Sequence, residues 1–133
     1  MTRSEDLHEQ PTAAEYKIAR VSHGFSVREI AEYLGQSYRT VQEWEAGRYD
    51  PPASVMPLLR ELEAVTDAAV DEVVQSALAS GAPFVLSVPF NLAAAEGIYP
   101  SVTRPSVCPV DWWRLVIARA ARRLPDAQVV WVR

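Results

Sequence analysis

The stretch that decides the fold is SVREIAEYLGQSYRTVQEWEAG, residues 26–47. Ser26 and Glu29 have the spacing of a capping box, in which each side chain bonds a free backbone N–H at the start of a helix. Gly35 is expected to end this helix, because glycine adopts the left-handed conformation at no steric cost. Ser37 follows two residues later and is placed to cap a second helix. The pattern therefore predicts two short helices joined by a tight turn.

Apolar residues fall at helical spacing on one face of each expected helix. They are Ile30, Ala31 and Leu34 in the first helix, and Val41, Trp44 and Ala46 in the second. Gly47 is expected to end the second helix. A short connection with a small residue where two helices cross predicts a helix-turn-helix. Because each of these features also has a purely structural use, a helical bundle without a DNA role stays an alternative.

The stretch resembles the Cro and phage-repressor (Xre-type) helix-turn-helix family over residues 16–62. The matching residues are Ser26, Glu29, Ile30, Ala31, Leu34, Gly35, Ser37, Val41, Trp44, Glu45, Gly47, Arg48 and Pro51. The resemblance implies a sequence-specific transcriptional regulator of phage or mobile-element type. It implies a homodimer, a repressor of its own operon, that binds an inverted repeat in double-stranded DNA with its third helix in the major groove.

The same resemblance implies which residues contact DNA. Exposed positions at the start of the third helix face base edges in this family, which here are Tyr38, Arg39, Gln42 and Glu43. Arginine pairs with guanine, glutamine with adenine, and a carboxylate accepts from cytosine. The implied phosphate contacts are the amide of Val27 and the side chains of Arg28, Ser37, Thr40 and Arg48. A solvated helix face is the alternative for each base-reading position.

The charge balance bears on this implication. The chain has 13 basic and 17 acidic residues, a net charge of −4. Nucleic-acid binders usually present a basic patch, because phosphate contacts release counterions. Within residues 16–49 basic residues slightly outnumber acidic ones, and Arg28, Arg39 and Arg48 are expected near one duplex-facing surface. We expect weak non-specific binding, a steep salt dependence, and affinity recovered by a dimer on two half-sites.

The rest of the chain predicts three segments: a flexible tail over residues 1–11, a helix-turn-helix domain over residues 12–66, and a C-terminal dimerisation or interaction domain over residues 67–133. Thr12 and Glu15 form a second capping box, so a first helix is expected over residues 13–22. Its expected inward positions are Ala14, Ile18, Ala19 and Val21.

A long helix is expected over residues 54–80, capped by Ser54 and ended by Gly81. Its apolar residues follow spacings of three and four, and residues 58–80 contain neither glycine nor proline. The alternative is a break at Thr66-Asp67, which could cap a new helix. A helix of this length needs a packing partner outside a four-helix domain, either the C-terminal half or a second subunit.

The C-terminal region changes character and predicts a strand-helix-strand arrangement. We expect a strand at residues 84–88, a brief helix at 92–96 capped by Asn91 and closed by Gly97, a loop at 99–109, a helix at 112–124 capped by Asp111, and a strand at 128–132. The expected inner face of the last helix is Trp113, Val116, Ile117, Ala120 and Leu124. The fold class is therefore mainly α with a small β element (α+β).

Two strands make too small a sheet to be stable alone, which predicts a dimer that shares one core. The expected interface residues are Phe84, Leu86, Val88, Trp112, Trp113, Val116, Val130 and Trp131. Residues 84–90, 92–99 and 111–113 are similar in layout to the dimerisation region of Aca-type autorepressors, which are encoded beside anti-CRISPR genes.

The sequence argues against an enzyme or a membrane protein. It has no run of about 18 apolar residues and no signal peptide at residues 2–10, and its single cysteine suits a reducing cytoplasm. His8, His23 and Cys108 have no metal-ligand spacing, and a nucleophilic Cys108–His23 pair would need the fold to join them. We expect no cofactor, metal or catalytic residue. The alternative function is an antitoxin-like module whose C-terminal half binds a protein, and structured RNA stays possible as a second ligand.

Overall fold

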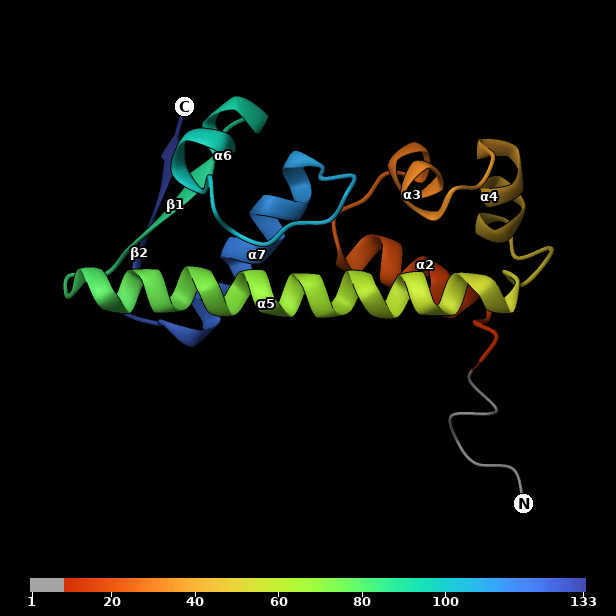
Figure 1. The fold of residues 1–133 in the computed structure, drawn as a ribbon, viewed down its shortest axis with the longest axis horizontal. Helices are drawn as coiled ribbons and strands as arrows, with labels where there is room; N and C mark the ends of the chain where they lie inside the picture. The colour runs from red at the N-terminus through yellow and green to blue at the C-terminus, as the bar shows by residue number, and fades with distance from the viewer. Residues whose placement is uncertain (1–8) are drawn as a thin grey trace, which may run out of the picture. The chain divides into compact units, whose positions relative to one another are not determined.

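The computed structural model describes residues 9–133 of the chain. Within these residues it contains six α-helices, one short 3-10 helix and a sheet of two strands, so the predicted class of mainly α with a small β element is confirmed (Figure 1). The chain divides into two compact units, Met1–Glu63 and Ala64–Arg133. His8 and most of the tail expected at residues 1–11 lie outside the described residues.

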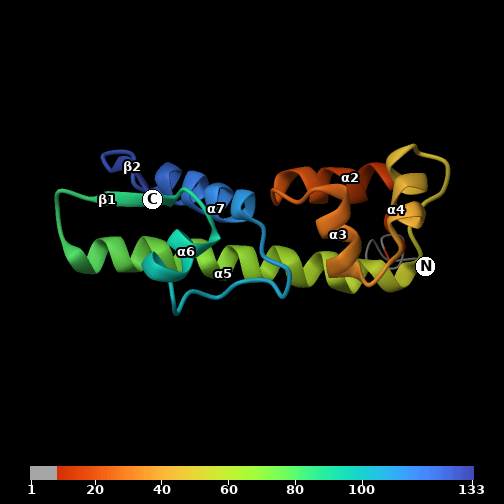
Figure 2. The same ribbon diagram turned by 90° about the horizontal axis from the view of Figure 1, so that it is seen from above.

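The first unit is helical, and α2, α3 and α4 begin where the capping signals predict. They are α2 (Ala13–Ser22), α3 (Val27–Leu34), α4 (Tyr38–Glu45), η1 (Ala53–Val55) and the beginning of α5 (Met56–Ser80). Both predicted capping boxes are formed, at Thr12 and Ser26. Gly35 ends α3 in the left-handed region, at φ 67°. Figure 2 shows α2, α3 and α4 gathered beside the first turns of α5.

The core of the first unit confirms the predicted faces of α3 and α4 but not that of α2. Ile30, Ala31, Leu34, Val41 and Trp44 are all buried. Ala46 is exposed, and on α2 the expected inward residues Ala14, Ile18 and Val21 are exposed, with Ala19 half-buried. Tyr16 is the fully buried residue of α2, and its ring meets that of Trp44 edge-on with centroids 5.4 Å apart. The phenol of Tyr16, which is amphipathic, supplies the contact that the purely apolar pattern assigned to the opposite face.

The start of the chain is tied to the loop before α5. Gln10 donates a side-chain hydrogen bond to the carbonyl of Pro51, and Pro11 is buried. Ser54 does not cap α5, because it lies inside the 3-10 helix η1 and α5 begins two residues later.

Helix α5 is continuous from Met56 to Ser80, and the alternative break at Thr66-Asp67 is absent. Thr66 is fully buried, and its Oγ1 accepts a hydrogen bond of 2.9 Å from the indole Nε1 of Trp112. The side chain that could have capped a new helix is therefore engaged in the core of the second unit.

The second unit contains the rest of α5 followed by β1 (Val85–Pro89), α6 (Leu92–Ile98), α7 (Val110–Arg123) and β2 (Gln128–Val132). The two strands pair parallel within one chain, with Val85 opposite Gln128 and Pro89 opposite Val132. Parallel pairing requires a long crossover, and α6 and α7 provide it. At the start of β2, the amide of Gln128 donates to the carbonyl of Phe84, just before β1.

Two helix boundaries in this unit differ from prediction. Gly97 lies inside α6 rather than closing it. Helix α7 begins at Val110 after Pro109, and Asp111 accepts a hydrogen bond from Arg114 instead of capping. Proline fits immediately before or within a first helical turn because its missing N–H would have no partner there. The predicted cap of α6 by Asn91 is confirmed.

The core of the second unit contains four residues that were expected at a dimer interface. Leu86, Trp112, Trp113 and Val116 are each at most 1% exposed within a single chain. Contacts within the chain contribute to this burial, since Trp112 bonds Thr66 of α5 and Trp113 stacks on Tyr99. Of the remaining expected residues, Phe84, Val88 and Val130 are half-buried, and only Trp131 is well exposed, at 59%.

Candidate nucleic-acid interface

The starts of α3 and α4 form the candidate interface, and serine caps build both of them. Ser26 accepts from the amide of Glu29, which leaves the amides of Val27 and Arg28 as the first free N–H groups of α3. Ser37 accepts from the amide of Thr40 and donates to its hydroxyl, at 3.1 and 2.8 Å. Free N–H groups and the helix dipole favour an anion such as a phosphate at both helix starts.

Arg28 and Tyr38 bring the two helix starts into contact. The guanidinium carbon of Arg28 lies 4.0 Å from the centre of the Tyr38 ring. Such a cation–π contact is worth about 0.5–1 kcal/mol at an exposed site. Arg28 was expected to contact phosphate and Tyr38 to contact a base, so the structure joins one residue from each expected group. The Tyr38 ring orients the Arg28 guanidinium, which covers one face of the ring.

We expect the ring of Tyr38, rather than its hydroxyl, to support DNA binding. Tyr38→Phe keeps the surface on which Arg28 stacks and should leave affinity within about twofold of the wild type. Tyr38→Ala removes that surface and should weaken binding by roughly 0.5–1 kcal/mol, or two- to fivefold. Fluorescence anisotropy with one duplex measures both. Equal losses for the two variants would instead assign the effect to a hydrogen bond from the hydroxyl.

Arg39 and Gln42 are the two expected base readers with exposed side chains and no described contact that would hold them to the protein surface. They lie on α4 one helical turn apart, on the side opposite the buried Val41 and Trp44. This spacing lets both side chains reach along one groove.

Glu43, the fourth expected base reader, is engaged with an expected phosphate ligand. Arg48 lies 3.4 Å from its carboxylate, with side chains that are 69% and 31% exposed. An exposed ion pair of this kind is worth about 0–1 kcal/mol, so a phosphate can displace the carboxylate at little cost. In the described structure the pair neutralises part of the positive charge of the interface.

A partly buried ion pair behind the interface fixes α4 on α2, and sequence reasoning missed it. Arg20 of α2 grips Glu45 of α4 with two hydrogen bonds of 2.8 Å, and its third nitrogen donates to the carbonyl of Phe25. Burial alone would raise the pKa of Glu45, but the hydrogen bonds and charge of Arg20 and the charge of Lys17 outweigh burial and hold it below the usual value. Glu45 was counted only as a motif residue, since no local pattern names a partner 25 residues away.

His23 and Cys108 do not form a reactive pair. His23 is buried after α2, where Nδ1 lies 2.6 Å from the carbonyl of Ala19 and Nε2 lies 2.8 Å from the carboxylate of Glu63. Cys108 belongs to the second unit, and burial raises the pKa of its thiol to about 12. A catalytic cysteine needs a lowered pKa, so the environment of Cys108 opposes nucleophilic chemistry.

Two capped helices joined by a tight turn, with exposed arginine and glutamine on the second, define a helix-turn-helix domain. Residues 17–62 match the model of a family described as helix-turn-helix. The match supports a DNA-binding regulator in general. The match ends before the C-terminal half and lends no support to the Aca-type resemblance there. A search of curated proteins gives no match to the chain.

None of the helices in residues 9–133 combines the length and apolar character needed to span a bilayer.

Proposed function

We propose that the protein is a sequence-specific transcriptional repressor that binds as a dimer to an inverted repeat, with the operator lying upstream of its own gene. Residues 12–66 would bind DNA, and residues 67–133 would dimerise the chain. In this proposal α4 enters the major groove, Arg39 and Gln42 read base edges, and Tyr38 and Glu43 lie at the margin. The ends of the helices supply the phosphate contacts through Val27, Arg28, Ser37, Thr40 and Arg48.

One observation carries the proposal: the face of α4 that bears Arg39 and Gln42 is exposed, while its opposite face is buried by α2 and α3. A solvated surface helix needs no such rigid support. Arg20, Glu45 and the Tyr16–Trp44 contact fix α4 against α2, which favours a helix that must be presented in one orientation.

Arg39 and Arg28 should differ in the kind of binding that they support. Arg39→Ala removes a base contact, so we expect a loss of roughly 1–3 kcal/mol on the operator and relaxed preference at one base pair. Arg28→Ala removes a phosphate contact, so we expect a similar loss on every duplex and a salt slope smaller by about one. Anisotropy titrations on operator and random DNA at two salt concentrations separate the two effects.

The matched control is Arg60→Ala, because Arg60 is an exposed arginine on α5 that has no proposed DNA contact. It should bind both duplexes like the wild type. Equal losses of Arg39→Ala on operator and random DNA would remove Arg39 from the set of base readers. No preference of the wild type for any upstream sequence would count against autorepression.

A second candidate function is protein binding, and exposed apolar side chains favour it. Ile18 and Val21 on α2 are 69% and 59% exposed, one helical turn apart. Together with the net charge of −4, they would suit a module that holds a partner protein on α2, rather than on the C-terminal half as the antitoxin-like alternative has it. Ile18→Lys should then abolish capture of that partner and leave DNA binding unchanged. A DNA-only regulator would capture no partner with either residue and would bind DNA unchanged.

A further inference from the structure

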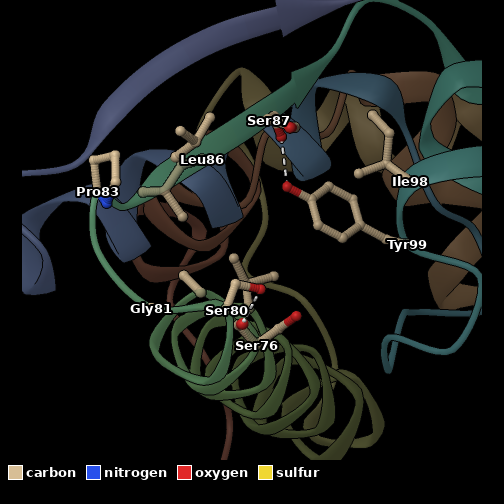
Figure 3. Close-up of a pocket in the computed structure, with 11 residues that line it drawn as sticks. Ser76, Ser80, Gly81, Pro83, Leu86, Ser87, Ile98 and Tyr99 are labelled. Atoms are coloured by element: carbon tan, nitrogen blue, oxygen red, sulfur yellow. Dashed lines mark hydrogen bonds between the residues drawn. The ribbon is translucent and has the colours of Figure 1, made fainter.

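The two-stranded sheet has two outer edges, and only the edge of β1 is obstructed. Hydrogen bonds from Gln128 to Phe84 and from Phe90 to Val132 fix which residues face the partner strand. By alternation, Ser87 and Pro89 present their backbone groups to the outer edge of β1. The hydroxyl of Tyr99 donates to the carbonyl of Ser87 beside a cleft of about 370 Å³ (Figure 3). Pro89 has no N–H to offer, so this edge is obstructed at Ser87 and Pro89, two of its three outward-facing residues; Val85 is the third.

The edge of β2 has none of these protections. Gln128, Val130 and Val132 face β1, so the N–H and C=O groups of Val129 and Trp131 point to the open side. Residues 128–132 contain no charge and no proline. Val129 and Trp131 are 49% and 59% exposed, and within residues 9–133 no third strand covers them. Proteins usually blunt such an edge with charge, proline or a covering element, and one left open is a template for another strand.

The open edge is complementary to itself. When two copies of β2 run antiparallel about a two-fold axis through Val130, Val129 of each lies opposite Trp131 of the other. Residues directly opposite each other in a hydrogen-bonded pair exchange two N–H···O bonds. The two symmetric pairs therefore make four bonds and use every free backbone group of Val129 and Trp131. An isologous contact of this kind closes as a dimer and does not propagate.

Side chains along the edge also fit a second copy. The pairing places the indole of Trp131 beside Val129 of the other chain, and aromatic–β-branched pairs are among the favourable cross-strand contacts. The same register places Arg133 opposite Ala127 of the other chain, one residue from the exposed Asp126.

We infer that the protein dimerises through its β2 edge, by antiparallel pairing of residues 128–132 with the same residues of a second copy into a four-stranded sheet. The inference rests on the dimeric part of the proposed function and replaces the interface expected from the buried tryptophans. It does not depend on DNA binding.

The first test places a charge on the edge. Val129→Lys should convert a dimer to a monomer at micromolar concentration in sedimentation velocity without DNA. Val85→Lys is the matched control, because Val85 is a valine on β1 rather than on β2 whose exposure, 48%, is close to the 49% of Val129. It should stay a dimer. A dimeric Val129→Lys, a monomeric Val85→Lys, or a monomeric wild type would each overturn the inference, and the last would assign the edge to a strand from another protein.

The second test fixes the register. In a Cys108→Ala background, Val130→Cys places two thiols across the two-fold axis in a non-hydrogen-bonded pair, where Cα atoms lie about 4.5 Å apart. That separation suits a disulfide. Val132→Cys is the control, since the proposed register puts it opposite Gln128. Under oxidation we expect a cross-linked dimer from the first variant alone, and cross-linking of both or of the second alone would overturn the register.

Dimerisation and DNA binding are measured separately, so the β2-edge inference and the DNA-binding proposal can fail independently. A dimer with the expected cross-link that fails to bind any operator would leave the β2 edge established and would refute the DNA-binding proposal. A monomer that still binds DNA specifically would refute the β2 edge and the dimeric part of the proposed function, and would leave DNA binding itself standing.

Discussion

Trp112→Ala should destabilise the second unit by about 3–5 kcal/mol, the cost typical of truncating a buried aromatic. Trp112 is fully buried, packs edge-on against Trp113 with ring centroids 4.9 Å apart, and donates from Nε1 to Thr66. The substitution leaves a cavity and removes the bond that ties α7 to α5. Because whole domains are stable by only about 5–15 kcal/mol, we expect much of the second unit to open.

Hydrogen exchange read by mass spectrometry measures this effect in each unit separately. Protection should fall in α7, β1 and β2 and stay near the wild-type level in α3 and α4. Trp112→Phe keeps a large ring but loses the N–H, and Thr66→Val loses the acceptor. In a double-mutant cycle, urea unfolding should show coupling of about 1 kcal/mol between them. A Trp112→Ala protein as stable as the wild type would contradict the assigned core.

Arg20→Ala should destabilise the helix-turn-helix unit by about 3 kcal/mol and weaken DNA binding with it. The substitution leaves the carboxylate of Glu45 in a poorly hydrated position, and removing one partner of a buried pair costs more than the pair itself contributes. The two side chains are each 16% exposed, so solvent screens them weakly. Arg20→Lys should recover only part of the loss, because an ammonium cannot form the two parallel bonds.

Urea unfolding followed by circular dichroism measures the loss, with Arg60→Ala as an exposed control expected within about 0.5 kcal/mol of the wild type. If Arg20→Ala were no less stable than Arg60→Ala, the pair would be dispensable for the position of α4.

The same pair predicts a pH dependence. The pKa of Glu45 is lowered in the folded chain, so its contribution is complete above its ordinary pKa of 4.5 and is lost as the pH falls through the folded value. Glu45→Gln should therefore be less stable than the wild type at pH 7, and the difference should shrink below pH 4.5. A constant difference between pH 7 and pH 3.5 would show that the ionised carboxylate is not the stabilising form.

The helix-turn-helix could be predicted because its signals are local. Ser26, Glu29, Gly35 and Ser37 act within three residues of where they stand, through caps and a left-handed turn that any surrounding fold would accept. The apolar stripes of α3 and α4 were likewise confirmed, since a helix of two turns has only one face that can be buried.

Features that depend on distant partners could not be predicted. Arg20 and Glu45 are 25 residues apart, and Thr66 and Trp112 are 46 apart. The apolar pattern of α2 predicted that Ile18 and Val21 would face inward. Tyr16 is the buried residue instead, because its ring packs against Trp44. The two strands were predicted, but their parallel pairing within one chain depends on the crossover through α6 and α7. Trp112 and Trp113 of α7, which were expected at a dimer interface, are buried within the single chain.

Selection of binding sites from a random-sequence duplex library tests the central claim most directly, because it assumes no operator. The proposal predicts enrichment of an inverted repeat, and selection with Arg39→Ala should lose preference at one position of each half-site while keeping the rest. An enriched sequence that does not change with Arg39→Ala would remove α4 as the reading element. No enriched sequence at low salt would contradict sequence-specific DNA binding itself.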